Sequence, residues 1–141
     1  MVSRVYVEKK PEFDVESKQL EVELRTLLGI EGLESLRTIR RYDVEGIDDE
    51  LFEQCVPTVF SAPQVDMAHR RLPTLTDDSV LFAGEYLPGQ FDQRADSASE
   101  CIQFVSCGER PEVRSATLYL LECDLSDDDI AAIKHYVINP V

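Results

Sequence analysis

The length and charge of this sequence exclude several classes of protein. A chain of 141 residues fits one domain and buries roughly 70% of its unfolded surface, so it needs no disulfide or metal for stability. Its 28 acidic and 14 basic residues give a net charge of -14, which repels nucleic acid and anionic lipid. No apolar run approaches the roughly 18 residues that span a membrane. We therefore expect no nucleic-acid partner and no membrane partner.

The four cysteines are Cys55, Cys101, Cys107 and Cys123. They form no CxxC pair and lack the short spacing of a zinc site, and no signal peptide precedes them. This usage is typical of reduced thiols, so we expect a cytoplasmic protein.

The first half of the chain predicts two strands and two helices in alternation. Residues 3–10 have the β-branched and aromatic content of a strand. Asp14 is a suitable N-cap for a helix over 15–28, where leucines recur on one face. Residues 36–46 predict the next strand. A second helix begins at Asp48, and Pro57 should kink or end it.

The second half repeats this order after a loop over about 61–78. Within that loop, residues after Pro63 offer a further strand. A strand is predicted over 79–87, and Asp92 caps the helix that follows it. The strand over 115–124 is apolar on both faces and so central in a sheet. Ser126 caps the last helix.

The two halves, about 1–63 and 79–141, match when the chain is shifted by 77 or 78 residues. The matched pairs are Glu8 with Glu85, Pro11 with Pro88, Phe13 with Phe91, Asp14 with Asp92, Ile47 with Leu125, Asp49 with Asp127, Phe52 with Ile130 and Pro63 with Pro140. We interpret this as an internal duplication, although convergent patterning could mimic it. The predicted fold is α+β, a sandwich of sheet and helices with pseudo-twofold symmetry. Because the chain ends where the counterpart of the extra strand would begin, we expect a fragment of a longer protein.

Motifs for phosphate and metal binding are incomplete. Gly84 and Gly89 have the spacing of a phosphate-binding loop, but Gln90 and Phe91 replace its Lys and Ser/Thr. His69 and His135 each lack a His, Cys, Asp or Glu three or four residues further along the chain. We predict no cofactor or metal site.

The cysteines and the acidic run have structural interpretations. Helical spacing groups Cys101 with apolar residues of its helix, and Cys55 with those of another, so both are predicted to be core residues. Asp127, Asp128 and Asp129 occupy the first turn of a helix, where they complement its dipole. No residue is assigned a catalytic role.

Residues 86–104 hold the remaining candidates. Asp92 is explained as a cap and Gly89 as a turn residue. Four further polar side chains exceed what a helix start requires and are predicted to contact a partner: Gln90, Gln93, Arg94 and Asp96. The alternative is a solvated first turn.

Four long stretches resemble a known family. They are residues 4–30, 36–60, 85–103 and 124–141, and the strings RYDVEG and PGQFDQRADSA are the most specific within them. The sequence resembles the N-terminal domain of the large, single-chain phosphoribosylformylglycinamidine synthase of purine biosynthesis, over nearly the whole chain.

The resemblance implies that the parent enzyme converts formylglycinamide ribonucleotide, glutamine and ATP to the amidine, glutamate, ADP and phosphate. A C-terminal glutaminase domain then holds the catalytic triad, and a central synthetase domain binds ATP, Mg²⁺ and the ribonucleotide. The N-terminal domain is similar to a fused dimer of the small subunit of the split enzyme. Its implied role is noncatalytic: it bridges the two catalytic units and helps retain ammonia.

A second hypothesis of a different class stays open. The chain would then be a free-standing acidic protein, either a small regulatory binding module or an unrecognised cysteine hydrolase.

Overall fold

The computed structural model describes residues 2–73, 75, 79–86, 89–123 and 125–138. Over these residues five strands form one antiparallel sheet in the order β3-β1-β2-β5-β4. The strands are β1 Val2–Lys9, β2 Leu33–Glu45, β3 Asp66–His69, β4 Ser79–Glu85 and β5 Glu112–Cys123. The two longest strands, β2 and β5, pair with each other at the centre of the sheet, as the apolar pattern of 115–124 predicts.

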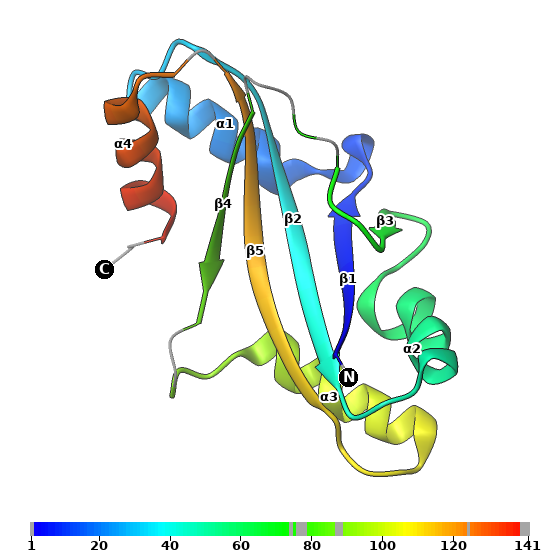
Figure 1. Ribbon diagram of the computed structural model, residues 1–141. Helices are drawn as coiled ribbons and strands as arrows, with labels where there is room; N and C mark the ends of the chain where they lie inside the picture. Colours follow the sequence, from blue (N-terminus) through cyan, green and yellow to red (C-terminus); the bar gives the residue numbers. More distant parts are fainter. Residues whose placement is uncertain (1, 74, 76–78, 87–88, 124, 139–141) are drawn as a thin grey trace.

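Four α-helices accompany the sheet, so the predicted α+β class is confirmed. They are α1 Val15–Leu27, α2 Asp49–Cys55, α3 Gln93–Ser106 and α4 Asp127–Ile138. A short 3₁₀ turn, Pro11–Phe13, precedes α1. In Figure 1, α1 and α3 pass behind the strands at opposite ends of the sheet.

The start of each α-helix is fixed by the side chain that the sequence predicts as its cap. The caps are Asp14, Asp48, Asp92 and Ser126. Each accepts a hydrogen bond from the backbone N–H three residues later, at 3.0, 2.8, 3.0 and 3.2 Å respectively. These bonds satisfy amide groups that the helix itself leaves without acceptors.

Several boundaries differ from the predictions, and β5 begins at Glu112 rather than at residue 115. β2 begins at Leu33 rather than at residue 36, with an irregular register at its first residues. α2 ends at Cys55, and a π-helical turn, Val56–Phe60, follows it. Pro57 has no N–H to donate to the preceding turn, so the regular α-helix cannot continue through it. The backbone stays helical there but adopts the wider π-helical turn.

The prediction that Cys101 is a core residue is wrong. The buried side chains of α3 are Ala95, Ala98, Ser99 and Ile102. Cys101 lies beside this stripe and is exposed, whereas Cys55 of α2 is buried as predicted. The buried stripe of α3 consists mostly of small residues and includes a serine, so the hydrophobic periodicity in its sequence is weak. With Ser99 on the buried side, Cys101 lies on the exposed side.

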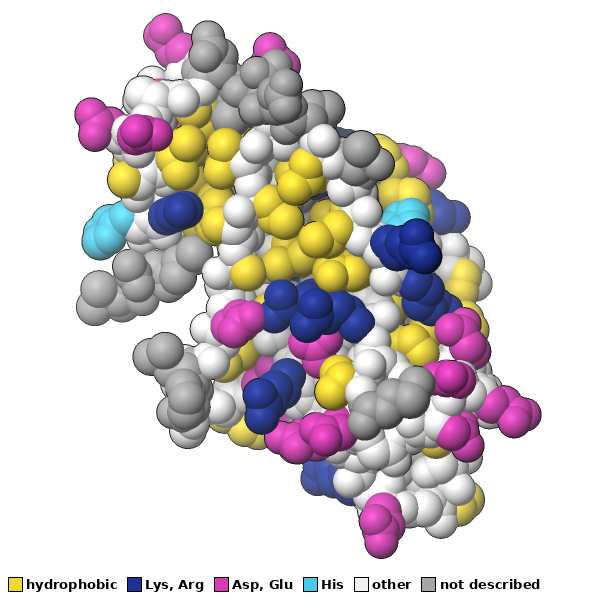
Figure 2. Space-filling view, viewed as in Figure 1, with side chains coloured by type: hydrophobic (Ala, Val, Ile, Leu, Met, Phe, Trp, Pro, Cys, Tyr) yellow, Lys and Arg dark blue, Asp and Glu magenta, His cyan; other side chains and the backbone are white. Residues whose placement is uncertain are grey.

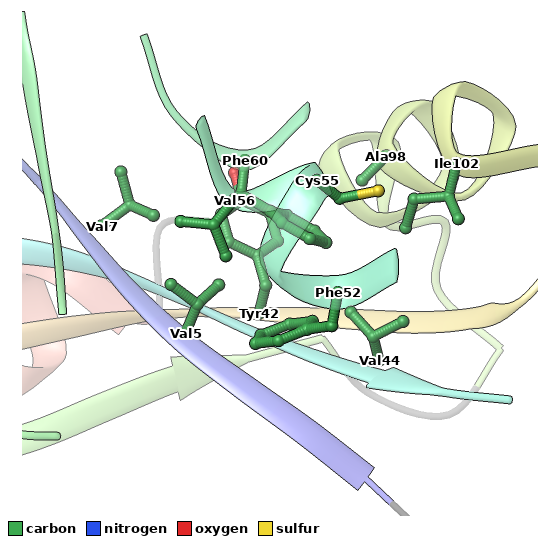
Figure 3. Close-up of a cluster of buried hydrophobic side chains, with 10 residues drawn as sticks. All are labelled: Val5, Val7, Tyr42, Val44, Phe52, Cys55, Val56, Phe60, Ala98 and Ile102. Carbon is green, nitrogen blue, oxygen red and sulfur yellow. The ribbon is translucent and has the colours of Figure 1, made fainter. Parts of the chain in front are cut away.

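All four helices pack on one face of the sheet, where they form two separate cores. The α2–α3 core, drawn in Figure 3, joins these helices and the π-helical turn to β1 and β2 through Val5, Val7, Tyr42, Val44, Phe52, Cys55, Val56, Phe60, Ala98 and Ile102. The α1–α4 core joins those helices to β2, β4 and β5 through Leu24, Ile30, Leu33, Leu36, Phe82, Leu121 and Ile133. Each core therefore contains helices from both halves of the chain.

The opposite face of the sheet is not covered by any described helix. Figure 2 shows that apolar side chains gather over its middle and that charged side chains lie together below them. Tyr6, Ile39 and Leu118 form a third apolar cluster there. At the edge of the cluster the nearly buried carboxylate of Glu8 accepts two hydrogen bonds from Arg37, at 2.6 and 2.7 Å. This pairing neutralises a carboxylate that the fold removes from water.

Candidate functional site

Asp92 connects the start of α3 to the central sheet. Besides capping α3, its carboxylate accepts hydrogen bonds from the backbone N–H of Ser115, at 2.9 Å, and from the Ser115 hydroxyl, at 2.8 Å. Ser115 belongs to β5, beyond the point where β4 ends at Glu85. One carboxylate thus accepts hydrogen bonds from backbone amides of both α3 and β5. The sequence predicts the cap alone, and the bonds from Ser115 add a second structural role that it does not predict.

The four predicted partner-contact residues do not share one site. Gln93 and Arg94 line a groove on one side of Tyr86. Gln90 lines a different cavity, of about 620 Å³, that also contains Tyr86. Asp96 is engaged within the domain, because its carboxylate accepts a hydrogen bond of 2.5 Å from Arg110. Whether these residues contact a partner stays a prediction, and the groove with Gln93 and Arg94 is its best candidate site.

This groove, the α3 groove, has a volume of about 600 Å³. Its α3 side consists of Gln93, Arg94, Ser97, Ala98 and Cys101. The rest comes from three other elements: Tyr42 of β2, Val59 of the π-helical turn, and Tyr86 after β4. Aromatic and apolar surface beside a few polar groups is typical of an interaction surface. The two tyrosines and Val59 were not predicted, because only the fold brings them to α3.

Arg94 has no hydrogen bond or ion pair within the described part of the chain. Most arginines do: carboxylates pair with Arg4, Arg25, Arg37, Arg40, Arg41, Arg70, Arg110 and Arg114. Three carboxylates line a small cavity together with Arg94 and are engaged elsewhere. Asp14 caps α1. Glu16 accepts two bonds of 3.0 Å from Arg40, and Asp66 pairs with Lys9 at 3.0 Å. The Arg94 guanidinium is therefore exposed with its donors available.

A second groove, the α1 groove, lies between α1 and α4 and has a volume of about 680 Å³. Its polar lining includes Glu16, Gln19 and Glu23 of α1 with His135 of α4. The hydroxyl of Tyr136 donates to Glu23 at 2.9 Å, and this bond raises the pKa of Tyr136. The lining carries carboxylates where the α3 groove carries a guanidinium. The two grooves thus differ in charge.

Arg40 connects the two halves at the centre of the helix-covered face. Its Nη1 donates to the Thr117 hydroxyl of β5 at 2.6 Å, and its Nη2 donates to the Glu16 carboxylate of α1. The Arg40 side chain is largely buried between the two cores. This position makes Arg40 a structural cation rather than a free binding group.

The site geometry gives little support to catalysis. Among the residues that the structure describes, no histidine or carboxylate lines the α3 groove beside the Cys101 thiol, so none of them offers a base to activate it. Burial raises the pKa of the Cys55 thiol, which keeps it protonated. Among the described residues, no group of three His, Cys, Asp or Glu side chains could hold a metal ion. Gly84 lies within β4 rather than in a phosphate-binding loop.

No protein family, curated protein or solved structure matches this chain. Within the described residues, no helix combines the length and the apolar character that a membrane crossing requires.

Proposed function

We propose that this chain is the N-terminal domain of a single-chain phosphoribosylformylglycinamidine synthase. In this role it is a noncatalytic domain that bridges the synthetase and glutaminase domains and supports ammonia transfer between them. ATP and Mg²⁺ belong to the synthetase domain of that enzyme, and the reaction takes place in the cytoplasm. The resemblance of the four long stretches suggests the family, and one structural observation supports the duplicated form that the family implies.

That observation is the correspondence between the two cores. Strand residues of the α2–α3 core match strand residues of the α1–α4 core 77 positions later: Val5 with Phe82, Tyr42 with Tyr119, and Val44 with Leu121. Helix residues match at 78 positions: Leu20 with Ala98, Leu24 with Ile102, and Cys55 with Ile133. Chance αβ patterning predicts similar elements, but it does not predict matched contacts in two cores. The correspondence therefore favours a duplicated unit.

The arrangement of the sheet also fits a fused dimer. β2 and β5 pair antiparallel along their length, and each carries the first strand of its own half on its outer edge. In this register Arg40 pairs with Thr117. Thr117 is also the residue that the 77-residue shift matches to Arg40. The strand pairing at the centre of the sheet therefore joins equivalent segments of the two halves. Such self-complementary pairing is the hallmark of an interface with twofold symmetry.

A bridging role is consistent with the surface of the domain. No described helix covers one face of the sheet, and the opposite face carries two grooves of different charge. A module that contacts two different domains needs two chemically distinct surfaces. The hydrolase alternative has less support, because none of the described residues that line the groove with Cys101 is a histidine or a carboxylate.

The reading frame of the gene tests this proposal. It should continue beyond the codon of Val141 into a glycine-rich nucleotide-binding sequence and then a glutaminase. A stop codon there would favour a free-standing protein. The purified chain should also show neither glutaminase nor ATPase activity, whereas turnover that Cys101→Ala abolishes would establish the hydrolase.

A further inference from the structure

The outward side of α3 continues the α3 groove along the helix. Arg94, Ser97 and Cys101 line the groove, and the next residues at helical spacing are Phe104 and Val105. These five residues form the α3 stripe. Phe104 is 84% exposed and Val105 is 41% exposed. The stripe thus has a cation at one end and uncovered apolar side chains at the other.

The dimensions of the stripe suit an extended or helical segment. Ten residues separate Arg94 from Phe104, which corresponds to roughly 15 Å along an α-helix. Aromatic surface from Tyr42 and Tyr86 borders the part of the stripe near Arg94. A large exposed phenylalanine next to such a groove is characteristic of an anchor that a partner covers.

The charge of the stripe selects the partner. Arg94 has no described counter-charge, and Glu16 and Asp66 are held by Arg40 and Lys9. A guanidinium in this state binds a carboxylate through two parallel hydrogen bonds. At the position 78 residues before Arg94 stands Glu16, which lines the α1 groove together with Glu23. The α1 groove therefore offers an acidic segment no guanidinium to bind.

We propose that the α3 stripe binds a polypeptide segment that presents a carboxylate to Arg94 and an apolar side chain to Phe104. The identity of the partner rests on the proposed function: the segment belongs to another domain of the synthase. The chemistry of the segment does not depend on that identity. It is acidic and apolar, and it contacts the exposed side of α3, whereas Ile102 of the same helix faces the α2–α3 core (Figure 3).

The test is a ¹⁵N NMR titration of the full chain with a capped helical peptide of leucine, alanine and glutamate. A peptide with glutamine at every glutamate position is the charge control. Shifts of backbone amides should concentrate at the α3 stripe and at Tyr86. The glutamine peptide should bind about 3- to 10-fold more weakly, as the loss of an exposed guanidinium–carboxylate pair requires.

Matched variants separate the two ends of the stripe. Arg94→Gln should weaken binding of the glutamate peptide about 3- to 10-fold, while Arg71→Gln, at another exposed arginine, should leave it unchanged. Phe104→Ser should weaken both peptides, while Leu27→Ser, at an exposed leucine of α1, should weaken neither. Shifts outside the stripe, equal affinity of the two peptides, or no binding at millimolar peptide would overturn the proposal.

Two further outcomes distinguish the inference from the proposed function. Self-association of the chain that Arg94→Gln abolishes would assign the stripe to a second copy and overturn the inference. A chain that binds the glutamate peptide at the stripe but does not associate with the synthase would keep the inference and contradict the proposed function. If the wild-type and Arg94→Gln chains associate equally well with the synthase, the proposed function is kept and the inference about the α3 stripe is contradicted.

Discussion

Removing the buried side chains of Leu24 and Ile102 should destabilise the whole domain. Leu24 belongs to α1 and Ile102 to α3, and both are 0% exposed. Substitution by alanine removes three carbon atoms with their hydrogens in each case, which at about 0.8 kcal/mol per methylene equivalent amounts to about 2.4 kcal/mol. Incomplete closure of the cavity brings the expected loss to about 3–4 kcal/mol for each variant. A domain of this size has a total stability of about 5–15 kcal/mol.

Urea denaturation, followed by far-UV circular dichroism and by tyrosine fluorescence, measures these losses. Because each core contains helices of both halves, either substitution should shift one transition seen by both probes. The controls are Leu27→Ala in α1 and Phe104→Ala in α3, whose side chains are 69% and 84% exposed. They should change the free energy of unfolding by no more than about 0.5 kcal/mol.

The reasoning would be refuted by a loss below about 1 kcal/mol in either buried variant, which would mean that the cavity closes or that the side chain is not packed. Two separate transitions in either variant would be equally damaging. They would show that the halves unfold independently, contrary to the interlocked cores.

Further predictions concern ionisable groups. Glu8→Gln should cost about 1–2 kcal/mol, because it leaves Arg37 beside an uncharged, nearly buried partner; Arg114→Gln is the exposed control. Burial raises the pKa of Tyr119 from its ordinary value of 10.0, so the free energy of unfolding should fall as the pH rises through the raised pKa. Tyr119→Phe should reduce this loss of stability at alkaline pH. An unchanged dependence of stability on pH in the variant would contradict the prediction. Against a thiol reagent, Cys101 should react in the native protein and Cys55 only after unfolding.

The features that the sequence predicts well are those set by neighbouring residues. A helix cap requires only one oxygen and an amide three residues away, so Asp14, Asp48, Asp92 and Ser126 are recognisable from the sequence. The central position of 115–124 follows in the same way, because a strand that is apolar on both faces is better shielded from water between two other strands than at an edge of the sheet.

The candidate site is predicted less well because it is assembled from distant segments. Gln93 and Arg94 were identified as surplus donors, but nothing local indicates that Tyr42 and Tyr86 lie beside them. The error at Cys101 has a similar origin. The helical phase of α3 depends on which side chains the sheet and the π-helical turn cover, and the covered set includes the polar Ser99.

The central claim is that this chain serves as the bridging domain of the synthase. Its most direct test adds the chain to a phosphoribosylformylglycinamidine synthase that lacks its N-terminal domain and measures formation of the amidine with glutamine or with ammonia as nitrogen source. The account predicts saturable binding and a rise in glutamine-dependent turnover, with a smaller effect on ammonia-dependent turnover. A chain that neither binds the truncated enzyme nor changes its glutamine-dependent turnover would contradict the account.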